Sequence, residues 1–173
     1  MATSNSTQIL LDTNKRAVIK RIGVFDSAGG DEALTVFIDP RTLSGTLNAA
    51  GQLWTAGDAL PAGFAANAIS IYRVIFSVDS EVGHLQLKWQ GATDRTILAL
   101  GTGTGDTNPQ SNLPPILNNA VTPTGNITIQ TVGTTANAAY TLIVELHKNT
   151  QYYSSGQFVD PAAFNYPPYN VKP

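Results

Sequence analysis

The sequence contains no cysteine, and only 13% of its 173 residues are charged. The lack of cysteine excludes disulfide bonds, thiolate zinc sites, iron–sulfur clusters and cysteine nucleophiles. Ten Lys and Arg stand against twelve Asp and Glu, which gives a net charge of -2. Neither sign is concentrated enough to form a phosphate-tracking groove or an anionic-lipid patch, so we expect no nucleic-acid partner.

Long apolar runs are also missing. No stretch approaches the ~20 apolar residues of a membrane-spanning helix. The N-terminus, MATSNSTQILLD, has no basic start followed by an apolar run. We therefore expect no membrane partner and no signal peptide. The length fits one domain of ordinary size.

Alternation of apolar and polar residues with a period of two is the dominant pattern that is present. It is clearest at residues 84–90, HLQLKWQ, and at residues 140–147, where Ile143 is the single exception. Each of these segments predicts a half-buried strand. Weaker strand patterns lie at residues 8–12, 16–25, 33–39, 96–100 and 126–132.

Residues 69–79 form the eighth predicted strand, and they are apolar on both faces. Such a strand is either central in its sheet or covered on both sides, so its second face needs a cover. Strict alternation predicts Tyr72, Val74, Phe76 and Val78 on one face and Ile69, Ile71 and Ile75 on the other.

Turn-forming residues separate the predicted strands, for example at residues 26–30, 79–83, 91–94 and 122–125. No segment has a convincing helical pattern, and the best attempt, residues 65–69, is short. Many short strands with frequent turns predict an all-β fold, an antiparallel β-sandwich that is jelly-roll-like. We assign residues 1–148 to this domain.

Two internal segments depart from the strand pattern. Residues 40–68 are rich in Gly and Ala and include Trp54 and Phe64. We interpret them as a long inserted loop, which in a compact domain is usually functional or packed on something. Residues 101–112, GTGTGDTNPQSN, contain no large apolar residue, and they predict a solvent-exposed loop.

Residues 149–173 hold four of the six tyrosines and four of the ten prolines. The prolines predict an extended C-terminal arm, and its aromatic side chains require a partner surface. Either the arm folds back over its own sandwich or it lies along a neighbouring subunit. Our candidate partner-contact residues are Trp54, Phe64, Tyr152, Tyr153, Phe158, Phe164, Tyr166 and Tyr169.

Residues for catalysis are scarce. His84 and His147 fall on the polar phase of predicted strands, with no carboxylate at metal-site spacing to either. No G-x-S-x-G occurs, and residues 101–106 lack the third glycine of a dinucleotide-binding loop. The acidic segment 26–32 is interpreted as a hairpin turn rather than a calcium loop. We expect no catalytic residue, no metal site, no cofactor and no enzymatic activity.

One basic cluster is present, made of Lys15, Arg16, Lys20 and Arg21. Alternation places Lys20 and Arg21 on opposite faces of a strand. We interpret that strand as a sheet edge that is protected by charge.

Several segments together resemble small virion structural proteins of tailed bacteriophages. They are ILLDT at residues 9–13 with RAVIK at 16–20, residues 71–79 with 84–89, and residues 126–131 with 140–148. The resemblance covers residues 7–148 and excludes the insertion and the arm. It implies a β-rich, non-enzymatic capsid decoration or tail protein, located in the virion and assembled in the bacterial host cytoplasm. No site residue carries over.

The function that we expect is a capsid decoration or cement subunit, which binds the major capsid protein and copies of itself as a homotrimer. One alternative is a component of the tail or the head–tail junction. An alternative of another class is a carbohydrate-binding β-sandwich in which Trp54, Trp89 or the arm tyrosines stack on sugars. Trp89 is in phase with Leu85 and Leu87, which predicts a core position, so Trp54 is the main candidate for stacking.

Overall fold

The computed structural model describes residues 4–45, 60, 62–107 and 115–149. These residues form nine strands and three short helical segments, η1 (Pro40–Thr42), α1 (Ala62–Asn67) and η2 (Ser80–Val82). In chain order the strands are β1 (Ser4–Asp12), β2 (Arg16–Val24), β3 (Thr35–Ile38), β4 (Ile69–Val78), β5 (His84–Thr93), β6 (Arg95–Gly101), β7 (Gly103–Asp106), β8 (Val121–Val132) and β9 (Ala139–Lys148).

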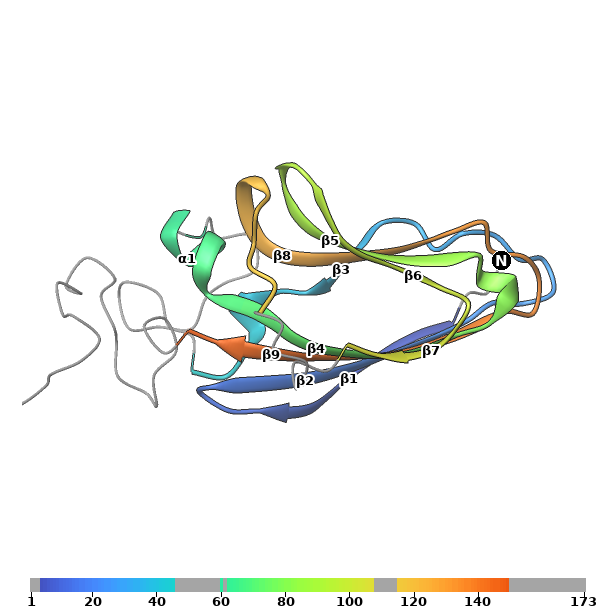
Figure 1. The fold of residues 1–173 in the computed structure, drawn as a ribbon, viewed down its shortest axis with the longest axis horizontal. Helices are drawn as coiled ribbons and strands as arrows, with labels where there is room; N and C mark the ends of the chain where they lie inside the picture. The colour runs from blue at the N-terminus through green and yellow to red at the C-terminus, as the bar shows by residue number, and fades with distance from the viewer. Residues whose placement is uncertain (1–3, 46–59, 61, 108–114, 150–173) are drawn as a thin grey trace, which may run out of the picture.

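The strands build two antiparallel sheets that lie one above the other (Figure 1). Sheet A has the order β1-β2-β9-β4-β7, and sheet B has the order β3-β8-β5-β6. The apolar face of each sheet turns toward the other sheet, because burial of that face is the main favourable term in folding. This arrangement confirms the predicted all-β antiparallel sandwich.

The strand pairing is nested. From β2 onward, the first strand pairs with the last, β2 with β9, and moving inward β3 pairs with β8, β4 with β7 and β5 with β6. A long hairpin rolled in this way into two four-stranded sheets is a jelly roll. β1 is an additional fifth strand on the free side of β2.

Strict alternation along the central strands creates the core. On β9, every second residue from Tyr140 to Leu146 is at most 2% exposed. On β5, Leu85, Leu87 and Trp89 are buried in the same way, which confirms the core position predicted for Trp89. No helix among the described residues has the length and apolarity that crossing a membrane requires.

A bulge corrects the face assignment of β4. The register of β4 with β9 shifts between Ile71 and Arg73, so strict alternation does not hold along the strand. Ile69 and Ile71 therefore share the buried face with Val74, while Ile75 lies on the outer face.

The loop predicted over residues 101–112 is wrong for Gly103–Asp106, which form β7 and pair with β4, although three of these four residues are exposed as predicted. Residues 108–112 lie outside the described residues. The glycines of β7 conceal its strand pattern in the sequence, but they also allow the strand to form. A Cβ atom on Gly105 would lie 2.4 Å from the Phe76 ring, so the lack of a side chain lets β7 approach β4.

The predicted turn at residues 122–125 is also wrong, because β8 begins at Val121 and runs through it. Thr122 and Gly125 have positive φ angles of 48° and 87°, so the strand is irregular here and looks like a turn in sequence. Its first part still pairs with β5, at Gly91 and Thr93.

The described ends of the 40–68 insertion pack on the sandwich rather than forming a loop. α1 begins at Ala62, earlier than the segment that sequence favours, and covers the end of β8 (Figure 1). The Asn118 side chain donates a hydrogen bond to the Ala65 carbonyl over 3.1 Å. Leu43 and Phe64 are each 3% exposed and belong to the core.

Candidate contact surface

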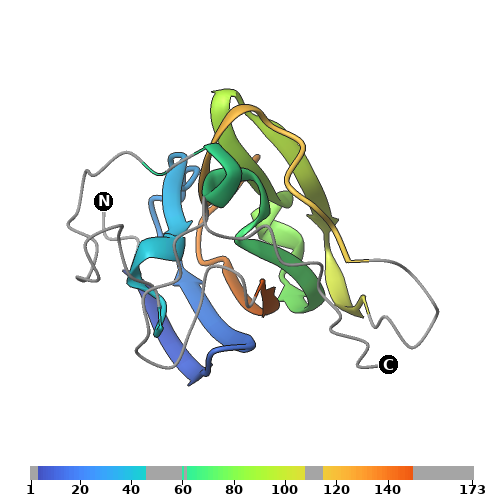
Figure 2. The ribbon, with the colours of Figure 1, turned by 90° about the vertical axis from the view of Figure 1, so that its left-hand side faces the viewer.

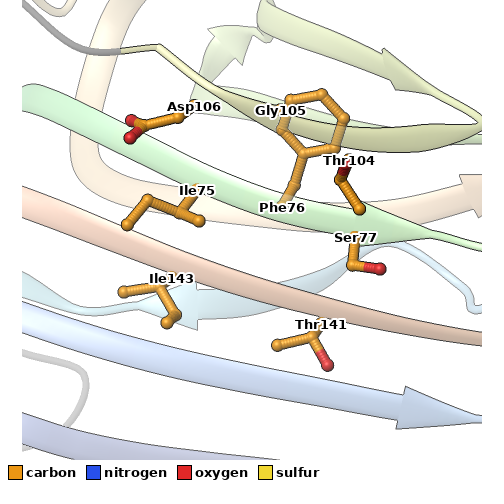
Figure 3. A pocket seen from close by; sticks show the side chains of 8 residues that line it. All are labelled: Ile75, Phe76, Ser77, Thr104, Gly105, Asp106, Thr141 and Ile143. Carbon is orange, nitrogen blue, oxygen red and sulfur yellow. The ribbon is translucent and has the colours of Figure 1, made fainter.

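A hollow of about 450 Å³ lies on the outer face of sheet A. It spans β4, β7 and β9, and Figure 3 shows its lining. Its floor is the cross-strand pair of Ile75 on β4 and Ile143 on β9, which are both half-buried. The complete lining is Ile75, Phe76, Ser77, Thr104, Gly105, Asp106, Thr141 and Ile143.

An ion pair closes one end of the hollow. Arg73 donates to the two Asp106 carboxylate oxygens over 2.8 Å and 2.5 Å. The hydrogen bonds from Arg73 hold the pKa of Asp106 below its ordinary value. The Asp106 carboxylate is therefore paired with Arg73. The rest of the hollow is mainly apolar, and its polar groups are the small side chains of Ser77, Thr104 and Thr141.

Two irregularities of the sequence meet at this place. Ile143 is the apolar exception on the polar face of its strand, and Ile75 belongs to the second apolar face of residues 69–79. The structure pairs these two residues directly. Of the second apolar face that sequence predicts, only Ile75 lies outside, and with Ile143 it forms the floor of an apolar hollow on the outer face of sheet A.

Inside the sandwich, Arg21, Glu32 and Tyr140 form a buried polar cluster. Arg21 donates from Nε to the Tyr140 hydroxyl over 3.0 Å and forms an ion pair with Glu32. The Tyr140 hydroxyl donates to the second Glu32 oxygen. Arg21 also donates to the Thr7 hydroxyl over 3.0 Å, and its guanidinium lies 5.9 Å from the Phe37 ring centre.

The cluster satisfies its own charges, so its role is structural. Arg21 and Glu32 are 8% and 5% exposed. Burial alone would lower the pKa of Arg21, but the hydrogen bonds to Tyr140 and Glu32 raise it on balance. The cluster ties β1, β2 and β9 to the segment before β3, because each of these supplies one partner.

Arg21 corrects the interpretation of the basic cluster. The strand that carries it, β2, lies between β1 and β9 and is not an edge. Arg21 shares its phase with Ala17 and Ile19, which are buried. An arginine on the same face as buried apolar residues indicates an inward side chain with a buried partner, and this pattern could have been recognised in the sequence. Lys20 lies on the opposite face, as predicted.

A second buried ion pair fastens the end of β9. The Lys148 side chain is fully buried, and its ammonium group binds the Asp12 carboxylate and the Ser44 carbonyl. Burial lowers the pKa of Lys148, which the Asp12 carboxylate opposes. The Lys148 backbone N–H also donates to the Lys15 carbonyl over 2.9 Å, so β9 ends beside the β1–β2 turn.

The acidic segment 26–32 is divided among separate contacts. Asp26 accepts from the Ala28 N–H over 2.9 Å, and Asp31 accepts from the Thr134 N–H over 2.8 Å, while Glu32 turns inward to Arg21. Within the described ranges, no group of three His, Cys, Asp or Glu side chains gathers at one point. The interpretation of this segment as a hairpin turn is wrong, because it connects β2 of sheet A to β3 of sheet B, which do not pair with each other.

Both histidines lie on half-buried positions of their strands. His147 stacks on Tyr72 with ring centres 3.9 Å apart. A nitrogen of His84 lies 2.8 Å from the Gln86 amide nitrogen. Each ring is thus engaged by a neighbouring side chain of sheet A or sheet B.

The candidate partner-contact residues fall into two groups. Phe64 is a correction: its side chain is buried under α1 and is not available to a partner, because the helix turns it toward the core. The others lie outside the described residues, and they are Trp54, Tyr152, Tyr153, Phe158, Phe164, Tyr166 and Tyr169.

No protein-family model, curated protein or solved structure matches the chain. The arguments for function therefore come from the fold and from the outer face of sheet A.

Proposed function

We propose that the protein is a non-enzymatic virion structural protein of a tailed phage, which binds the capsid surface as a decoration subunit and stabilises the particle. The observation that carries the proposal is the apolar hollow on the outer face of sheet A. An apolar hollow on the outer face of a sheet is typical of a surface that binds a partner. We assign the major capsid protein as the partner of this face.

Two further points support the proposal. The nested pairing of β2 to β9 is a jelly roll, an architecture that recurs in viral capsid domains, and this support is an analogy at the level of the fold. Hydrogen bonds join the strands within each sheet, and two buried ion pairs hold further segments together, so the domain is rigid. A rigid domain suits repeated identical contacts on a symmetric particle.

The hollow gives the first test. Ile143→Asp places a charge on the apolar floor without disturbing the core, because the side chain faces outward. Loss of one buried isoleucine removes about 1.5–3 kcal/mol of binding free energy, so binding to particles should weaken by about 10–150-fold. The measurement is a titration of the purified protein against phage particles that lack it, followed by pelleting and electron microscopy.

Val24→Asp is the matched control for this test. Val24 lies on the same sheet, is 48% exposed and is absent from the hollow, so its replacement should leave the affinity unchanged. Binding of the wild-type protein to tails or to the portal end would support the alternative of a tail or junction component. Equal affinities of wild type and Ile143→Asp would contradict the assignment of this face.

The aromatic C-terminal segment gives the second test. A chain that ends at Asn149 keeps the hydrogen bond from the Asn149 N–H to the Ala68 carbonyl, which measures 2.8 Å. We expect it to fold with an unchanged circular dichroism spectrum and to lose most of its binding to particles, because six aromatic side chains are removed. Normal decoration by the folded truncated protein would show that this segment has no role in binding.

The homotrimer expected from the sequence stays a prediction, which the molar mass of the protein in solution tests. A carbohydrate-binding role gains no support from the described residues, since Trp89 is 1% exposed and lies in the core.

A further inference from the structure

β1 is one edge of sheet A, and none of its residues is buried. Eight of its nine residues are exposed, and Asp12 at its end is half-buried. Sheet A has one strand more than sheet B. As a result, even Ile9, which faces the same way as the buried Ile19 beside it, is 51% exposed.

The edge lacks the usual protection against pairing. A free edge presents unpaired backbone N–H and C=O groups, which proteins guard with charge, proline, short length or bulges. Residues 4–11, SNSTQILL, contain no charged residue and no proline. Asp12 is neutralised by Lys148. The one bulge lies between Ile9 and Leu11 and leaves residues 4–9 in regular register.

Exposed apolar side chains gather on the same side of the sandwich. β3 is the edge of sheet B, and Figure 2 shows β1, β2 and β3 together on one side, with β6 and β7 on the other. Of the eight exposed large hydrophobic residues among those described, six lie on this side: Ile9, Leu10, Leu11, Val24, Leu34 and Val36.

The lengths and charges of the sheet edges select the occupant. β3 and β7 have four residues each, and β6 has seven and begins with the charged Arg95. Among the described strands, an edge of nine residues with a neutral body occurs only in β1. The strand that matches β1 in length and neutrality is therefore the β1 of a second copy.

We propose that two copies of the protein pair through β1, antiparallel and about a two-fold axis perpendicular to sheet A. The two five-stranded sheets then become one continuous sheet. Antiparallel pairing over residues 4–9 places no charged side chains opposite each other. Both B sheets lie on the same side of the joined sheet, since a perpendicular axis does not exchange its faces.

This contact is independent of the virion proposal and differs from a threefold assembly. About a two-fold axis, the residue at the centre of the contact lies opposite its own copy. In a threefold ring of unlike edges, no residue meets its own copy in this way. The two arrangements therefore differ both in mass and in which residues meet.

Cysteine cross-linking tests the pairing directly, because the natural chain has no cysteine that could interfere. Single cysteines are placed one at a time over residues 4–9 in the full chain, and the proteins are treated with a mild oxidant. Opposite residues on paired strands have Cβ atoms about 4.5–5.5 Å apart, close to the span of a disulfide. At least one variant should form a covalent dimer in high yield.

Leu117→Cys is the control, since this residue is 69% exposed and lies outside β1 and β3. It should form little dimer under the same conditions. If no position from 4 to 9 cross-links better than Leu117→Cys, the proposal is wrong.

Sedimentation equilibrium supplies a second readout. The wild-type protein should be a dimer. In the double variant Ser6→Lys with Gln8→Lys, the dissociation constant of the dimer should rise at least about tenfold, because the added charges repel each other across the axis. The control, Leu117→Lys with Val121→Lys, introduces the same charge at exposed positions elsewhere and should not change the dimer. A wild-type monomer, or a trimer that the β1 lysines leave intact, would overturn the two-fold contact.

Discussion

Replacing Glu32 with alanine should lower the free energy of unfolding by about 3–5 kcal/mol, because removal of one partner leaves a buried charge without compensation. Arg21 would keep its buried position with no counter-ion, and the Tyr140 hydroxyl would lose its acceptor. For a chain of this length the loss corresponds to a fall in Tm of about 6–20 °C. Urea unfolding at neutral pH, with the slope checked for constancy, measures it.

A triple variant is the control for this prediction. Arg21→Met, Glu32→Met and Tyr140→Phe together replace the polar cluster by apolar side chains of similar size, which often costs little. This variant should recover most of the stability lost by Glu32→Ala. A loss below about 1 kcal/mol for Glu32→Ala would contradict the structural role of the cluster.

The same cluster predicts a response to alkaline pH. Burial raises the pKa of the Tyr140 phenol, and the Glu32 carboxylate raises it further. The unfolded chain therefore releases this proton first, so the contribution of Tyr140 is present below about pH 10 and is lost as the pH rises above it. Tyr140→Phe should consequently lose less stability than wild type between about pH 8 and about pH 11.

Replacing Trp89 with alanine should cost about 3–5 kcal/mol, because it opens a large cavity between the two sheets. Trp89 is 1% exposed and pairs in register with Ile127 on β8 and Arg95 on β6. Its indole nitrogen has no hydrogen-bond partner among the described residues. Trp89→Phe therefore loses no hydrogen bond and should cost only about 1–2 kcal/mol.

Thermal and urea unfolding of the two Trp89 variants checks this order. Similar losses for Trp89→Phe and Trp89→Ala would contradict this prediction. The prediction also bears on the carbohydrate alternative, since a core tryptophan changes stability when replaced, whereas a stacking platform on the surface would change sugar binding alone.

Regular alternation predicted the parts of the fold where each side chain follows its strand. β5 keeps the period of two from His84 to Trp89 and β9 keeps it along its whole length, and their inward apolar residues belong to the core. Alternation also predicted a second apolar face of residues 69–79, of which only Ile75 lies outside, while Ile69 and Ile71 are buried. The meeting of Ile75 with Ile143 in one hollow depends on the pairing of β4 with β9, which no local pattern contains.

Other elements were hidden because long-range contacts decide them. β7 is a strand only because Gly105 makes room for Phe76. The faces of β4 depend on a bulge, which has no residue signature in this sequence. Phe64 looks like a loop aromatic in sequence, yet α1 packs it into the core.

The sequence by itself determined the all-β class, the antiparallel sandwich, the core phase of Trp89 and the absence of thiol chemistry, since these follow from local period and composition. The order of the strands, with its nested pairing, came from the tertiary structure. Only the tertiary structure decided that Arg21 is buried with Glu32 and Tyr140, that β1 is the unprotected edge, and that Ile75 meets Ile143. The physical reason is that pairing between strands distant in the chain sets which side chains face each other and which edge remains open.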